Sequence, residues 1–191
     1  MEISWIRIYL LSGLLLHKAI WEFLKSCQGD PSAKQSWSAK VLVLSTVKIG
    51  ILFGIIAQTF LPVVLPISDQ PSGLAAAGVV FYTLGLTVAI AGRVQLGRNW
   101  TDIEKSYVKR EHQLVSHGLY RFVRHPIYTG DLLLLFGLEL ALNSWLVLGV
   151  AALAVYVRRK AIHEEQKLTE AIPEYGGYCR RTTRFVPFLP V

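Results

Sequence analysis

Five long apolar stretches constrain the fold of this chain more than any other feature. A helix needs about 20 mostly apolar residues to cross the apolar core of a bilayer, which is about 30 Å thick. Five stretches approach or exceed this length, at residues 3–24, 41–67, 73–96, 126–142 and 145–157. The composition, with 52% hydrophobic and 17% charged residues, is also unusual for a soluble domain. The sequence therefore predicts an all-α integral membrane protein with about five transmembrane helices, in a single membrane domain over residues 1–191.

The first and last stretches carry the weakest signals. The first contains His17, Lys18 and Glu22, so this segment could instead form an amphipathic helix that lies in the membrane interface. The last is short for a span unless its basic end reaches out of the apolar core. The N-terminus has an acidic residue at Glu2 and no evident cleavage site, so we expect the first segment to remain in the mature protein.

Basic residues predict the orientation of these helices. Lys and Arg gather after the first stretch, after the third stretch and in the C-terminal tail, whereas the turns at residues 68–72 and 143–144 contain neither. The positive-inside rule places the three basic segments in the cytoplasm and the two bare turns outside. We therefore expect an outside N-terminus and a cytoplasmic C-terminus. The net charge of +7 is then explained by topology and anionic lipid headgroups, without a nucleic-acid partner.

A basic and aromatic segment, residues 118–130, leads into the fourth apolar stretch. Two Arg, one His and two Tyr lie within the nine residues from Tyr120 to Tyr128. The His125–Pro126 pair predicts the start of a helix, because Pro is favoured in the first turn. The free N–H groups and the positive dipole end of this helix favour binding of a carboxylate or phosphate, and the two arginines add to that attraction. Alternatively, the arginines anchor the helix at lipid headgroups and the tyrosines form an aromatic belt.

A second polar cluster, Glu164 and Glu165, follows the fifth stretch. If the helix continues past Val157, it carries both carboxylates into the cytoplasm, where Glu164 could meet a cationic amino group. The short connection at residues 143–144 makes the fourth and fifth helices antiparallel neighbours. His125 and Glu164 then lie on the same side of the membrane and could face one polar cofactor pocket. The alternative is an ordinary solvated helix surface with turn-to-turn neighbours.

These pieces, taken in order, resemble the isoprenylcysteine carboxyl methyltransferase family, within the larger group that includes membrane phospholipid N-methyltransferases. The resemblance covers roughly residues 93–190. Each short motif is weak alone, but the ordered set, with a hairpin of fitting length between its halves, is fairly specific. The matching residues are His112, Gln113, Leu114 and Val115, then Gly118, Leu119 and Tyr120, then residues 124–130, then Glu164, Glu165 and Leu168, and finally Glu174, Tyr175, Tyr178, Arg181, Arg184 and Pro187.

The resemblance implies an enzyme that uses S-adenosylmethionine in a cytoplasm-facing pocket. Residues 1–96 would form N-terminal transmembrane helices, and residues 97–191 the cofactor-binding and catalytic half. A lipid or prenylated acceptor would enter from the bilayer, and an isoprenylcysteine-like carboxylate, being already anionic, would need no general base. The positions that match cofactor contacts in the family are His112, Gln113, Leu114, Val115, Tyr120, His125, Pro126, Ile127, Tyr128 and Glu164.

One position departs from the family pattern. Four residues before the first Glu of the pair, where carboxyl methyltransferases of this family have a substrate-binding Arg, the chain has Lys160, with Arg159 beside it. Lysine offers a cation but not the bidentate fork of arginine. We expect Lys160 and Arg159 to bind the acceptor during catalysis.

Three alternatives stay open at this point. The acceptor could be the amine of a phospholipid. Residues 124–131 and 174–176 also resemble the C-terminal region of sterol reductases, whose cofactor is a nicotinamide dinucleotide. A non-catalytic membrane scaffold would not require the two polar clusters to converge.

Cys27 and Cys179 have no metal-ligand spacing around them and are expected to be reduced thiols. The sequence leaves the oligomeric state open.

Overall fold

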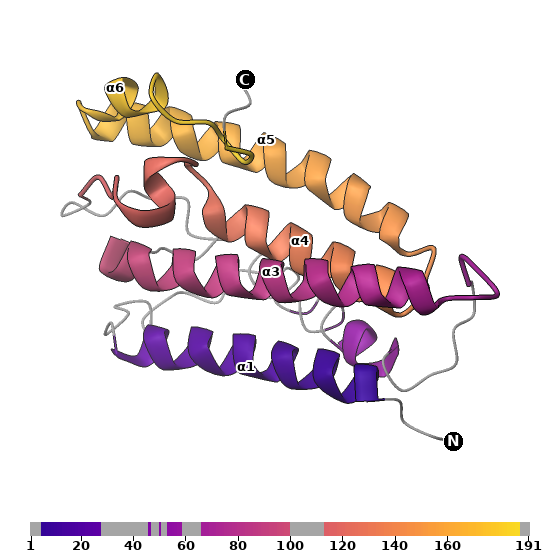
Figure 1. The fold of residues 1–191 in the computed structure, drawn as a ribbon. Coiled ribbons are helices and arrows are strands. Elements are labelled where there is room, and N and C mark those ends of the chain that lie inside the picture. Colours follow the sequence, from indigo (N-terminus) through magenta and orange to yellow (C-terminus); the bar gives the residue numbers. More distant parts are fainter. Residues whose placement is uncertain are drawn as a thin grey trace.

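The computed structural model describes residues 5–27, 46, 50, 53–58, 66–99 and 113–187, and most of the second apolar stretch lies outside them. Helices dominate this part of the chain (Figure 1). They are α1 (Trp5–Cys27), α3 (Ser72–Leu96), α4 (Pro126–Ala141), α5 (Val147–Ala171) and the short α6 (Tyr175–Cys179), with 3-10 turns η2 (Gly97–Asn99) and η4 (Gly118–Arg121). The only β pairing among the described residues is two isolated bridges, Pro66 with Ser144 and Val123 with Thr183. The prediction of an all-α fold is confirmed for these residues.

Helices α3 and α4, and α4 and α5, pack antiparallel, whereas α1 packs parallel to α3. Early residues of α3 meet late residues of α4, because Gly78 approaches Ala141 and Gly92 approaches Ile127, so these two helices are antiparallel. The turn after α4 reverses the chain into α5, and Asn143 adopts a positive φ of 55° in it. Helix α1 runs parallel to α3 (Figure 1). The ends of α1, α3 and α5 and the start of α4 therefore lie at one end of the molecule.

Glycines bring the backbones of α3 and α4 into direct contact. On α3 they recur every seven residues, at Gly78, Gly85 and Gly92, so they lie on one face of the helix. A Cβ atom added at Gly85 would lie 2.2 Å from the backbone nitrogen of Leu134, and one at Gly137 would lie 2.1 Å from that of Tyr82. Small residues permit such close approach between helices in membranes. This contact fixes the start of α4 against the end of α3.

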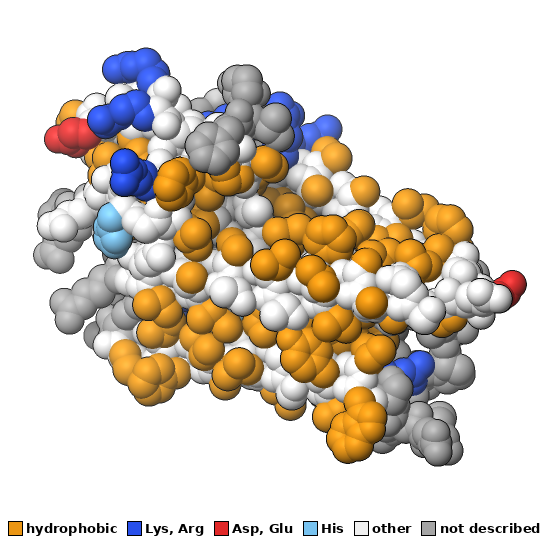
Figure 2. Space-filling view, viewed as in Figure 1, with side chains coloured by type: hydrophobic (Ala, Val, Ile, Leu, Met, Phe, Trp, Pro, Cys, Tyr) orange, Lys and Arg blue, Asp and Glu red, His pale blue; other side chains and the backbone are white. Residues whose placement is uncertain are grey.

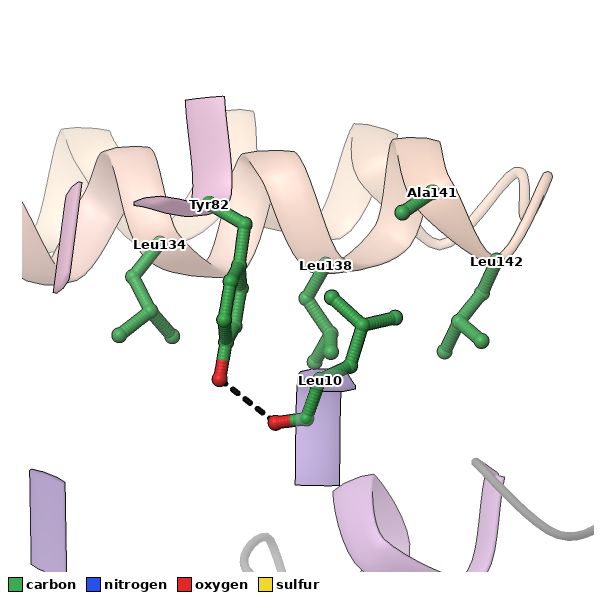
Figure 3. Close-up of a cluster of buried hydrophobic side chains, with 6 residues drawn as sticks. All are labelled: Leu10, Tyr82, Leu134, Leu138, Ala141 and Leu142. Atoms are coloured by element: carbon green, nitrogen blue, oxygen red, sulfur yellow. Dashed lines mark hydrogen bonds between the residues drawn. The ribbon is translucent and has the colours of Figure 1, made fainter. Parts of the chain in front are cut away.

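A buried cluster attaches α1 to the α3–α4 pair (Figure 3). It consists of Leu10, Tyr82, Leu134, Leu138, Ala141 and Leu142. The Tyr82 hydroxyl donates a 2.6 Å hydrogen bond to the carbonyl of Leu10, so the one polar atom of that side chain is satisfied within the cluster. Helix α1 thus packs into the bundle, which argues against the alternative in which it lies by itself in the membrane interface.

The surface of the helices is apolar along their length and basic at one end. On the face shown in Figure 2, hydrophobic side chains cover the helices, and most Lys and Arg side chains gather at the end that carries α6. Exposed examples include Leu84 on α3 and Leu148 on α5. Among the described helices, α3 alone is both long and apolar enough over an 18-residue window to cross a membrane. The count of five spans, the single domain and the outside N-terminus stay predictions.

The predicted boundaries around the second half agree with the structure. Helix α3 ends at Leu96, where Gly97 adopts a φ of 54° that favours glycine. Helix α4 begins at Pro126, as the His125–Pro126 pair predicts. Helix α5 continues past Val157 to Ala171, so Glu164 and Glu165 both lie on it.

Candidate active site

Two adjacent residues, His125 and Pro126, determine where α4 begins. His125 has non-helical backbone angles and caps the helix, and Pro126 follows at the first helical position, fully buried. The N–H of His125 donates to the carbonyl of Arg184 at 3.1 Å. In any helix the first N–H groups lack an intrahelical carbonyl partner. Since Pro126 has no N–H, the groups of this kind in the first turn belong to Ile127 and Tyr128.

Residues that follow α6 lie across this helix start. We call residues 180–187 the C-terminal strap. The N–H of Arg124 donates to the carbonyl of Thr183 at 2.8 Å, and the N–H of Thr183 donates to that of Phe122 at 3.2 Å. The Thr129 hydroxyl donates to the carbonyl of Phe185 at 3.0 Å. These bonds join the strap to the residues on both sides of His125.

Glu165 lies at the centre of a buried ion cluster beneath the strap. Its Oε1 accepts from Nε of Arg124 at 2.8 Å, from Nε2 of His125 at 3.0 Å and from Nε of Arg184 at 3.0 Å. Its Oε2 accepts from a terminal nitrogen of Arg184 at 2.8 Å. Burial alone would raise the pKa of Glu165, but hydrogen bonds from His125 and the two arginines outweigh it and hold the pKa far below its usual value. The cluster thus contains an ionised carboxylate and links α4, α5 and the strap.

Glu164 faces the same helix start from a more open position. Its carboxylate accepts a 2.8 Å hydrogen bond from the Tyr128 hydroxyl. Its Oε2 lies 3.9 Å from Nδ1 of His125, and its side chain is 32% exposed whereas that of His125 is 8% exposed. The rings of His125 and Tyr128 stack with centroids 5.4 Å apart. The structure therefore brings His125, Tyr128 and Glu164 together at the start of α4.

The predicted segment before η4 is described only in part. His112 lies outside the described residues. Gln113 is exposed, and its N–H donates to the Asn99 side chain at 3.1 Å. Leu114 packs against the cluster formed by Ile172, Tyr175 and Tyr178, and Val115 is half-buried. Leu114 is thereby connected to α6, whereas no described contact places Gln113 or Val115 beside His125.

Three of the residues expected to bind the cofactor are covered by other parts of the protein: Tyr120 and Pro126 are buried, and Ile127 is half-buried. Tyr120 is 6% exposed, its hydroxyl donates to the carbonyl of Gly92 at 3.4 Å, and its own carbonyl accepts from Tyr178 at 2.7 Å. Burial raises the pKa of Tyr120 above its ordinary value. Pro126 and Ile127 pack against Gly92 of α3. These side chains support the helix start, and the aromatic belt considered for Tyr120 does not form.

Lys160 and Arg159 lie on different faces of α5. Lys160 precedes Glu164 by four residues, so both occupy one face of the helix, a turn apart. Lys160 is half-buried, whereas Arg159 is exposed. By helix geometry Arg159 lies about 140° around the axis from Glu164. The structure thus places Lys160, rather than Arg159, in line with Glu164.

Two roles differ from the sequence-based expectation. Arg124 was expected to attract an anion, but its guanidinium binds Glu165 and the carbonyls of Cys179 and Thr182. Glu165, expected only as a neighbour of Glu164, is the centre of the ion cluster. The sequence did contain a partial signal, because Arg124, Glu165 and Arg184 all belong to the motifs that match the family in order. Nothing in the sequence indicated that these three side chains contact one another.

A family model described as phospholipid methyltransferase matches residues 74–175, more than half of the chain. The match begins within α3 and ends at Tyr175, the first residue of α6, so it includes the α3–α4 contact and both glutamates.

Individual relatives match stretches of similar length. A cobalt-zinc-cadmium resistance protein, CzcN, of Cupriavidus metallidurans is 35% identical over 108 residues, which is 56% of this chain and 47% of that protein. Protein-S-isoprenylcysteine O-methyltransferase A of Arabidopsis thaliana is 30% identical over 117 residues, 59% of this chain and 58% of that protein. The chain thus spans about half or somewhat more of the length of these relatives.

A solved structure shares the fold. It is that of a eukaryotic intramembrane Ras methyltransferase, isoprenylcysteine carboxyl methyltransferase, with a TM-score of 0.61 and 18% sequence identity. The similarity covers 96% of this chain and 68% of the other. The resemblance to this methyltransferase group is confirmed: the chain belongs to the phospholipid methyltransferase family and has the fold of its isoprenylcysteine carboxyl methyltransferase branch.

Proposed function

We propose that this protein transfers a methyl group from S-adenosylmethionine to a lipidic acceptor in the membrane, most directly the carboxylate of an isoprenylcysteine-like substrate. Family membership supports methyl transfer, and several relatives are named protein-S-isoprenylcysteine O-methyltransferase. The observation that carries the proposal is the convergence of Glu164, Tyr128 and His125 at the start of α4.

The groups present there fit the amino-acid part of S-adenosylmethionine. Its ammonium requires an anion or acceptor, and Glu164 supplies a carboxylate that is neither fully buried nor neutralised by the ion cluster. Its carboxylate requires donors, and the N–H groups of Ile127 and Tyr128 lie at the positive end of the α4 dipole. Bound S-adenosylmethionine would supply a methyl group activated by the adjacent sulfonium.

The row of side chains on α5 fits an amphipathic acceptor. Tyr156, Lys160 and Glu164 follow one another at four-residue intervals on one face, from the apolar half of the helix toward its polar half. Lys160 would bind an acceptor carboxylate electrostatically, while the acceptor's apolar tail would lie along the helices in the bilayer. An anionic carboxylate needs no general base, so these residues would act by positioning the acceptor and excluding water.

The acceptor could instead be a phospholipid amine, and the description of the matching family favours this as the second candidate. The amine is protonated at neutral pH and must lose a proton before it can accept a methyl group. The site would then have to accept that proton as well as position the lipid. If the acceptor binds beside Lys160, as proposed, the lysine cation would attract a carboxylate and repel an ammonium.

Calorimetry of the purified protein in lipid nanodiscs tests the cofactor. We expect S-adenosylmethionine and its demethylated product, S-adenosylhomocysteine, to bind, and reduced nicotinamide dinucleotide not to bind. Binding of the nicotinamide alone would overturn the proposal in favour of a reductase. Binding of neither class would contradict a cofactor site of either kind and favour a scaffold.

A further inference from the structure

The ion cluster determines which nitrogen of His125 carries a proton. Glu165 is ionised, because two arginines bind a carboxylate whose side chain is only 11% exposed and whose pKa is held low. An ionised carboxylate can only accept hydrogen bonds. The Nε2 atom of His125, 3.0 Å from Oε1 of Glu165, must therefore be the donor. In the neutral ring, the other nitrogen, Nδ1, then carries a lone pair.

The ring is held so that this lone pair lies beside Glu164. The Tyr128 ring stacks on the imidazole with an interplanar angle of 12°, and the Phe185 ring of the strap lies 5.9 Å from it. The distance of 3.9 Å from Nδ1 to Oε2 of Glu164 is too long for a hydrogen bond. Two acceptors thus border the same space without satisfying each other. A donor cation, such as an ammonium, would complement both.

We infer that Glu165 is a positioning residue that fixes the His125 proton on Nε2, so that the Nδ1 lone pair, beside the Glu164 carboxylate, accepts from the ammonium of the bound cofactor. The inference rests on the proposed function for the identity of the ligand. The proton position itself concerns only residues of this chain.

Glu165→Leu separates positioning from simple support. A Leu side chain is close to Glu in size but offers no acceptor to Nε2, so the ring proton should move to Nδ1, beside the Glu164 carboxylate. His125 would then present an N–H where the ammonium needs an acceptor. Arg184→Gln is the matched control, since it removes two hydrogen bonds to the Glu165 carboxylate but leaves the His125 contact in place.

The first measurement is a long-range ¹⁵N–¹H correlation spectrum of the ligand-free protein labelled at histidine, taken where the ring is neutral. The His125 signals are identified by their loss in His125→Gln. We expect the proton on Nε2 in the parent and in Arg184→Gln, and on Nδ1 in Glu165→Leu. A proton on Nδ1 in the parent would overturn the inference, even if no variant could be purified in folded form.

The second measurement compares two ligands by calorimetry. S-adenosylhomocysteine carries the amino-acid group, and 5′-methylthioadenosine lacks it. Losing one hydrogen bond to a charged group weakens binding about tenfold or more. We expect Glu165→Leu to lose at least that factor for S-adenosylhomocysteine and less than about twofold for 5′-methylthioadenosine.

Equal losses for both ligands in Glu165→Leu would show a merely structural role and overturn the inference. If the parent binds neither ligand, the proposed function fails, and so does the assignment of the ammonium. The spectrum still reports separately whether Glu165 fixes the proton on Nε2, so the two failures are distinguishable.

Discussion

Glu165→Gln should destabilise the protein strongly at neutral pH. The substitution removes one negative charge from a cluster in which the side chains of Arg124, Glu165 and Arg184 are 7%, 11% and 14% exposed. Removing one partner of such a buried ion pair typically costs about 3–5 kcal/mol, because the remaining charges stay buried without compensation. Glu164→Gln is the matched control. Its side chain is 32% exposed and Gln can still accept from Tyr128, so we expect a cost of about 1 kcal/mol or less.

The destabilisation caused by Glu165→Gln should depend on pH. The pKa of Glu165 in the folded protein lies below the ordinary value of 4.5. A depressed carboxyl pKa contributes stability that is fully present above the unfolded pKa and is lost as pH falls below it toward the folded pKa. The stability gap between the parent and Glu165→Gln should therefore be largest at pH 7 and should narrow below about pH 4.5.

Chemical unfolding in a fixed detergent, followed by circular dichroism at pH 7 and at pH 3.5, measures both effects. If Glu165→Gln is as stable as Glu164→Gln at pH 7, the ion cluster does not hold the strap as described. A gap that stays constant from pH 7 to pH 3.5 would refute the reasoning from the depressed pKa.

Three further results are expected. Glu164→Ala should weaken S-adenosylmethionine binding at least about tenfold in calorimetry with an unchanged circular dichroism spectrum, because it loses a charged hydrogen-bond partner; unchanged affinity would contradict the site. Gly137→Ala should lower the free energy of unfolding by about 1–3 kcal/mol or more, because the added Cβ would meet the backbone of Tyr82. Gly149→Ala is the control: it has open space around it and should change the free energy of unfolding by about 1 kcal/mol or less. Equal values for the two variants in chemical unfolding would contradict the close contact of α3 and α4. Lys160→Ala should raise the KM for a carboxylate acceptor more than Arg159→Ala, with little change in cofactor affinity, and equal KM values would remove the acceptor role from Lys160.

Local signals in the sequence predict much of the second half of the fold. The proline after His125 starts α4, and Gly97 ends α3, because each residue has a backbone preference that acts without tertiary context. The bare turn at residues 143–144 and the long apolar runs predict the hairpin. These elements alone predict that His125 and Glu164 lie close together, because in an antiparallel pair the start of one helix lies beside the end of the next.

Contacts between distant residues could not be predicted in the same way. Glu164 and Glu165 are adjacent in sequence but differ by about 100° around the helix, and only packing decides which one faces the arginines. Arg184 reaches Glu165 because the strap folds back over the start of α4. Likewise, the glycines of α3 and α4 are visible in the sequence, but which of them face each other depends on the register of two helices about thirty residues apart.

Methyl transfer itself tests the central claim most directly. The purified protein in nanodiscs is given S-adenosylmethionine with a labelled methyl group, together with N-acetyl-S-farnesylcysteine or phosphatidylethanolamine, and the lipid product is then treated with base. A methyl ester releases labelled methanol under these conditions, whereas an N-methyl group stays bound to the headgroup nitrogen and releases none. The account predicts base-labile label on the farnesylcysteine, reduced in Glu164→Ala. Base-stable label on the phospholipid alone would contradict the carboxylate acceptor, and no label on either lipid, in protein that binds the cofactor, would contradict both acceptors proposed here.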